Sequence, residues 1–83
     1  MDYPFIGLIA IFPWDWAPRG WAKCDGQLLN ISHNCALFAL LGTEFGGNGT
    51  TTFALPKMTP IKTENGGDLA YYIALEGIFP SRP

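Results

Sequence analysis

Eighty-three residues leave room for one hydrophobic core, because folded domains usually need between about 50 and 200 residues. We therefore expect residues 1–83 to form a single domain. A core this small supplies little stability of its own, and small proteins often gain the rest by associating with further chains. The length thus favours a chain that folds around one core and then associates.

Charged residues make up only 14% of the chain, against about 25% in an average soluble domain, while 48% of the residues are hydrophobic. Disordered chains have low hydrophobicity and high charge, so this composition argues against disorder. The net charge of -2 excludes the basic surface that non-specific nucleic-acid binding requires. With so few charges, much of the surface must be apolar, and apolar patches usually mark association surfaces. We expect contacts with copies of the same chain or with a partner.

Short apolar runs broken by glycine and proline predict strands at 6–12, 27–31, 50–55 and 71–75. The first run is apolar at every position, so we expect both of its faces to be covered. Ser32 is the best N-cap in the sequence and predicts a helix of about ten residues that ends at Gly42. Leu37, Leu40 and Leu41 would face the core. One helix on a few short strands is a small α+β domain.

The remaining segments read as loops. Residues 13–26 hold three tryptophans without any period and predict a compact aromatic loop, and residues 57–68 are the most polar and predict a flexible one. No apolar run approaches the roughly 20 residues that span a bilayer, so we expect no membrane span. The first residues lack the basic region and the cleavage site of a classical signal peptide.

Catalytic groups are scarce, and we expect neither an enzyme nor a cofactor. His33 is the only histidine; a triad with Ser32 and Asp15 or Asp25 can be drawn, but adjacent residues point in different directions. The acidic residues are scattered singly, which leaves no pair for general acid–base hydrolysis. The glycine-rich segment 42–51 lacks the lysine of a phosphate-binding loop and is better explained as a permissive turn.

Cys24 and Cys35 allow two interpretations. A disulfide between them would close a loop of about twelve residues and stabilise the fold by about 3 kcal/mol. Alternatively, both are buried free thiols that behave as small hydrophobic side chains, and we favour this second interpretation. Together with His33 they lack the fourth ligand and the spacing of a metal site, so no metal is expected.

The aromatic residues suggest one further possibility. Trp14, Trp16 and Trp21 could form a face on which sugars stack, because aromatic planes with polar edges suit carbohydrate contacts. In a chain this short, aromatic residues are more often the core itself. Binding of cell-surface glycan through these three tryptophans is kept as an alternative function.

Several strings in this chain resemble the phage tail collar domain. They are APRGWAKCDGQLL at 17–29, ISHN at 31–34, ALFALLGT at 36–43, FGGNG at 45–49 and TTFALP at 51–56. The family includes the collar region of phage short tail fibres and bacterial proteins labelled microcystin-dependent. The end of the chain, YIALEGIFPSR at 72–82, is similar to the usual end of the microcystin-dependent type.

The chain departs from the family between these matching parts. Relatives usually continue after the Ala-Leu-Pro stretch with Asp-Leu-Arg-Gly-Arg and a long segment rich in Gly, Asn and His, whereas here only residues 57–68 stand in that place. His33 and Cys35 are also unusual for their positions. Since receptor specificity is expected in the long segment, this chain resembles a collar core without its variable tip.

The resemblance implies a non-enzymatic structural protein in a virion tail or in an extracellular or cell-surface bacterial assembly. Such domains associate around a fibre axis, which makes the chain itself and other tail or fibre proteins the expected partners, in a trimer, a ring or a filament. We expect the two apolar ends to supply the packing surfaces: Phe5, Ile6, Leu8, Ile9, Ile11, Phe12, Tyr71, Tyr72, Ile73, Leu75, Ile78 and Phe79.

Overall fold

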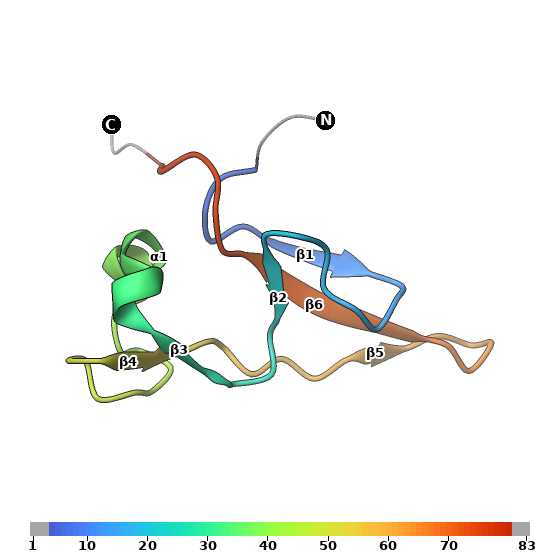
Figure 1. The fold of residues 1–83 in the computed structure, drawn as a ribbon. Coiled ribbons are helices and arrows are strands. Elements are labelled where there is room, and N and C mark those ends of the chain that lie inside the picture. The colour runs from blue at the N-terminus through green and yellow to red at the C-terminus, as the bar shows by residue number, and fades with distance from the viewer. Residues whose placement is uncertain (1–3, 81–83) are drawn as a thin grey trace.

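The computed structural model describes residues 4–80 (Figure 1). It confirms an α+β fold with one α-helix and antiparallel strands. The elements in chain order are β1 (Ile9–Phe12), β2 (Trp21–Lys23), β3 (Leu28–Asn30), a 3-10 turn η1 (Ile31–His33), α1 (Cys35–Leu41), β4 (Thr52–Ala54), β5 (Ile61–Lys62) and β6 (Asp68–Ala74).

The last strand, β6, is the centre of the larger sheet. It pairs antiparallel with β1 on one side, in the register Ile9 to Ile73, and with β2 on the other, in the register Ala22 to Ile73. Four residues of β6 are buried because neighbours cover both faces of a central strand: Ala70, Tyr72, Ile73 and Ala74. The strand predicted at 71–75 is thus confirmed and begins three residues earlier.

A smaller unit lies at one end of this sheet, where α1 and the pair β3–β4 sit side by side (Figure 1). Phe53 of β4 and Leu37 of α1 are fully buried and meet Ile73 of the larger sheet. The core is therefore shared by the helix and by both sheets. Its buried members are Ile6, Cys24, Leu37, Phe53, Leu55 and Ile73.

The start of the helix differs from the prediction. The Asn30 side-chain oxygen accepts hydrogen bonds from the Ser32 backbone N–H at 2.8 Å and from the Ser32 hydroxyl at 2.6 Å. Asn30 therefore caps η1, and α1 begins only at Cys35 and is seven residues long. Ser32 is therefore the residue that is capped and not the capping residue: both its N–H and its hydroxyl donate to the amide oxygen of Asn30.

The helix ends at Gly42 as predicted, but one of the three leucines expected to face the core is exposed. Gly42 ends α1 at a φ of 59°, and its N–H donates to the Phe38 oxygen at 2.7 Å. Leu37 is buried and Leu41 is half-buried, as expected for core-facing positions, whereas Leu40 remains 39% exposed.

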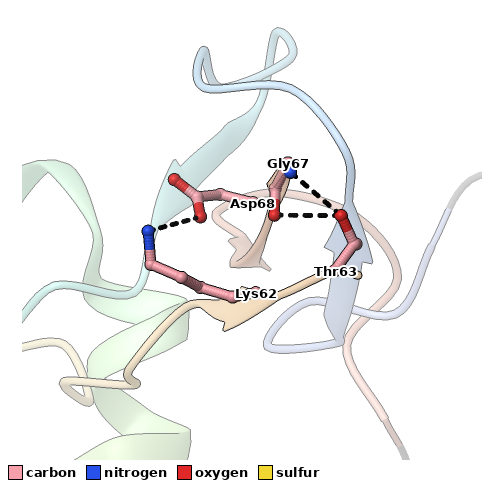
Figure 2. A network of polar contacts seen from close by, with 4 residues as sticks. All are labelled: Lys62, Thr63, Gly67 and Asp68. Carbon is pink, nitrogen blue, oxygen red and sulfur yellow. Dashed lines mark hydrogen bonds and ion pairs between the residues drawn. The ribbon is translucent and has the colours of Figure 1, made fainter. Parts of the chain in front are cut away.

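Both predicted loops contain strands. Trp21–Lys23 forms β2 within the segment 13–26, and Ile61–Lys62 forms β5 within the segment 57–68. The turn between β5 and β6 is held by Thr63, whose backbone N–H donates to the Gly67 oxygen at 2.8 Å. The Thr63 hydroxyl accepts the Gly67 N–H at 3.0 Å and donates to the Gly67 oxygen at 3.1 Å (Figure 2). The adjacent pair Lys62–Asp68, 3.5 Å apart, is highly exposed and adds little stability.

Candidate assembly surface

His33 is exposed and lies in η1, not in the first turn of α1. Within residues 4–80, no group of three His, Cys, Asp or Glu side chains is placed to hold a metal ion. No α-helix in the same range is long and apolar enough to cross a membrane.

The two cysteines have opposite environments and are not bonded to each other. Cys24 is 1% exposed in the core, and this burial, with a smaller effect of Asp25, raises the pKa of its thiol to about 11. Cys35, at the start of α1, is an exposed free thiol. The prediction of buried thiols is thus right for Cys24 and wrong for Cys35, because the first turn of α1 presents position 35 to solvent.

The three tryptophans do not form one open face on which sugars could stack. Two of them, Trp14 and Trp16, are stacked on each other. The Trp14 ring lies 4.8 Å from that of Phe12, with 8° between the planes, and 5.3 Å from that of Trp16, with 17° between the planes. Trp21 contacts Phe12 edge-on on the sheet, at 5.5 Å. Trp14 is therefore covered on its faces by Phe12 and Trp16, and Trp16, 61% exposed, ends the stack.

The spacing of Phe12, Trp14 and Trp16 at every second position was the sequence signal for this stack, and the emphasis on the tryptophans alone missed Phe12. The stack is fastened to the sheet by Tyr72, whose hydroxyl donates to the Trp14 backbone oxygen at 2.7 Å. The aromatic residues thus pack on one face of β6. Phe12, Trp14 and Trp21 are half-buried in this packing.

Exposed apolar residues are abundant in residues 4–80. Eleven large hydrophobic side chains are exposed, compared with ten buried hydrophobic residues in the core. Six of the exposed side chains come from the two ends of the chain and are among the residues expected to supply packing surfaces; we call them the terminal apolar surface: Phe5, Leu8, Ile9, Ile11, Ile78 and Phe79.

The other predicted packing residues do not belong to this surface. Ile6 is 7% exposed and Tyr72 and Ile73 are 0% exposed, so these three are part of the protein's own interior. Phe12, Tyr71 and Leu75 are half-buried against the sheet. They were predicted as contacts because an apolar run does not reveal which of its residues the tertiary fold covers.

Backbone hydrogen bonds bring the two ends of the chain together. The Ile6 N–H donates to the Ile78 oxygen and the Ile78 N–H donates to the Pro4 oxygen, both at 2.9 Å. Phe5 forms an isolated parallel bridge with Ile78. Gly77, at a φ of 145°, makes this approach possible, because a Cβ at that position would collide with the Pro4 oxygen.

Strand β1 is an edge of the larger sheet, and this overturns the expectation that both of its faces are covered. Ile9 and Ile11 are 39% and 45% exposed, on the same face as the buried Ile73. The helix and the β3–β4 pair lie at the end of the sheet where β6 finishes (Figure 1), and the core there includes Ile73 and also Ile6, just before β1. The core leaves Ile9 and Ile11 of the outer strand partly exposed.

Comparison with known families agrees with the resemblance seen in the sequence. A family model described as Phage Tail Collar Domain matches residues 7–60, from the turn before β1 to the residue before β5. Searches of curated proteins and of solved structures each returned no match. The matching family indicates a structural role in a phage tail fibre. Since the match spans more than half of its residues, the chain belongs to the phage tail collar domain family.

Proposed function

We propose that this chain is a non-enzymatic structural subunit of a phage tail fibre, or of a related extracellular bacterial assembly, and that it self-associates. One observation carries the proposal: the described residues expose eleven large hydrophobic side chains, whereas the core buries ten hydrophobic residues, of which three are alanines and one is a cysteine. Exposed apolar patches on soluble proteins usually mark association surfaces. Self-association would cover it and would add the stability that a small core lacks.

The terminal apolar surface suits contact between identical chains. Residues 4–14 and 77–80 contain no ionisable side chain, so two copies with a net charge of -2 can meet there without facing like charges. Each of its side chains is about half exposed, and burying the rest would contribute about 1 kcal/mol per residue. Several such residues together would outweigh the loss of freedom on association.

Light scattering over a wide concentration range, with negative-stain microscopy of the same samples, tests the proposal. We expect a trimer, a ring or a filament, and a shift to lower mass in the double variant Phe5→Ser/Ile78→Ser, which removes the paired residues at the two ends. The matched control is Leu28→Ser/Phe45→Ser, which removes exposed residues from outside the two end segments of the chain. A stable mass of 9.1 kDa at all concentrations would contradict self-association.

Trp16 supports a second candidate function, a small adhesin-like module that binds cell-surface glycan. Its ring ends the aromatic stack and is 61% exposed, which leaves an indole surface for a sugar ring. Trp14 and Trp21 would then hold the platform in place without contacting the sugar. Retention on a glycan array that is lost in Trp16→Ala and kept in Phe45→Ala, with assembly unchanged in both, would favour this function.

A further inference from the structure

Strand β1 has a free hydrogen-bonding edge whose polar groups can be assigned from the ladder with β6. The Ala74 N–H donates to the Leu8 oxygen at 2.9 Å and the Ala74 oxygen accepts from the Gly7 N–H at 2.9 Å, so Ala74 directs its backbone groups toward β1. Hydrogen-bonded and non-hydrogen-bonded pairs alternate in an antiparallel ladder. Ala10 and Phe12 therefore direct their backbone groups toward β6, and Ile9 and Ile11 direct theirs away from the sheet.

Nothing in the described chain occupies this outer edge. β1 is the terminal strand in the sheet order, and no backbone hydrogen bond outside the ladders of residues 4–80 involves Ile9 or Ile11. Natural edge strands are usually protected by a lysine, a proline or a bulge. A bulge precedes the regular part of this edge, because Gly7 and Leu8 both bond to Ala74, and Pro13 follows it. Between them, Ile9–Phe12 contains no lysine, proline or bulge and exposes Ile9 and Ile11 by 39% and 45%.

The residues of this edge are complementary to themselves. The sequence Leu8-Ile9-Ala10-Ile11-Phe12 is symmetric in character about Ala10, with an isoleucine on each side and a larger apolar residue beyond it. An antiparallel pair of two such strands places Ile9 of each copy opposite Ile11 of the other. A twofold contact needs this property, because the same patch must fit its own copy.

We propose that β1 pairs antiparallel with β1 of a second copy of this chain, with Ala10 facing Ala10 at the twofold axis. Ile9 and Ile11 of each copy then exchange backbone hydrogen bonds with Ile11 and Ile9 of the other, and the two larger sheets become one continuous sheet. On the aromatic face, Leu8 of each copy lies opposite Phe12 of the other. The small Ala10 lets the two backbones approach where the pair is closest.

This inference rests on the proposed self-association and adds the partner strand and its register. It also leaves part of the terminal apolar surface free, namely Phe5, Ile78 and Phe79. A twofold β1 contact combined with a second, different contact at those residues would extend the dimer into a filament.

A cysteine at position 10 tests the register. In a non-hydrogen-bonded antiparallel pair the Cα atoms are about 4.5 Å apart, which lies within the range that a disulfide spans. We expect Ala10→Cys, in a Cys35→Ser background that removes the exposed native thiol, to form a covalent dimer rapidly when treated with diamide. The control is Glu64→Cys in the same background, an exposed position in the β5–β6 turn.

A charged edge tests the pairing by a second route. Ile11→Lys places a charge on the pairing edge, and we expect the dissociation constant of the dimer to rise at least about tenfold. Ile61→Lys is the matched control, since Ile61 lies in β5 and is exposed by 41% against 45% for Ile11. Far-UV circular dichroism checks that each variant is folded.

The outcomes separate this inference from the proposed function. Rapid cross-linking at position 10 together with dissociation of Ile11→Lys supports the β1 pairing. If the wild type is multimeric but position 10 cross-links no faster than position 64, or Ile11→Lys associates normally, the β1 pairing is wrong and self-association uses another surface. If the wild type remains at 9.1 kDa throughout, both proposals fail.

Discussion

The hydroxyl of Tyr72 donates a hydrogen bond to the Trp14 backbone oxygen at 2.7 Å, across 58 residues of sequence. The bond fastens the aromatic stack to the central strand, because Tyr72 is fully buried and Trp14 lies between Phe12 and Trp16. We expect Tyr72→Phe to lower the free energy of unfolding by about 1 kcal/mol, since the Trp14 oxygen loses its partner. Urea denaturation measures this. Tyr71→Phe, on the adjacent half-buried residue, should cost less, and equal losses would contradict the role of the bond.

Gly77 is required for the approach of the two chain ends. A Cβ at position 77 would collide with the Pro4 oxygen, and Gly77 also has a φ that L residues rarely adopt. We therefore expect Gly77→Ala to lower the free energy of unfolding by about 3 kcal/mol or more. Gly66→Ala is the control, because Gly66 also has a positive φ but nothing lies within 4 Å of its added Cβ. It should cost about 1 kcal/mol, the strain of the backbone alone. Similar losses in thermal unfolding of both variants would exclude the collision.

Asn30, and not Ser32, should be the residue whose side chain caps the 3-10 turn η1. Removing the Asn30 side-chain oxygen leaves the Ser32 N–H without its partner, and we expect Asn30→Ala to cost about 1 kcal/mol. Ser32→Ala removes only the hydroxyl that donates to the same oxygen, and should cost less. Chemical denaturation of the two variants decides between them, and a larger loss in Ser32→Ala would restore Ser32 as the cap.

Stability should fall in alkaline solution because of Cys24. The folded pKa of its thiol, about 11, lies above the ordinary value of 9.0, so the folded state keeps a proton that the unfolded state releases. The stability from this difference is fully present below about pH 9 and is lost toward pH 11, at about 1.4 kcal/mol per pH unit. Denaturation between pH 8 and 11 measures the decline.

Two variants identify the group responsible. In Cys24→Ala the decline should begin only above pH 10, because burial and the nearby Asp15 raise the pKa of Tyr72 above 10.0 in the same direction. Cys35→Ala should keep the wild-type decline, since Cys35 is an exposed thiol. Identical pH profiles for wild type and Cys24→Ala would show that Cys24 does not control alkaline stability.

The elements that the sequence predicted well are those with strong local signals. The strand at 71–75, the glycine at position 42 that ends the helix and the strand before Pro56 all appear in the structure, as β6, the end of α1 and β4. Apolar β-branched runs and glycine at a left-handed position act through nearest neighbours in the chain. The family resemblance was also readable, because the strings between residues 17 and 56 that carry it lie within the matched residues 7–60, while the similar end of the chain at 72–82 lies outside them.

The elements that the sequence missed depend on partners far away in the chain. Trp21–Lys23 and Ile61–Lys62 became strands because β6 pairs with them, although their own residues suggested loops. Ser32 does not cap the α-helix, because Asn30 caps η1 at this point and α1 begins only after Asn34, which makes no side-chain cap. Tertiary pairing overrides weak local preference in short strands, since most of their stability comes from the neighbouring strand.

The sequence alone determined the class of this protein: low charge and many apolar residues favoured an association surface at the two ends, and the collar-like strings indicated its family. Only the tertiary structure decided which apolar residues face outward. Ile73 is buried and Ile9, paired with it in the sheet, is 39% exposed, although both are isoleucines in apolar runs. The difference is physical: Ile73 lies on the central strand with a neighbouring strand on each side, whereas Ile9 lies on an edge strand with a neighbour on one side only.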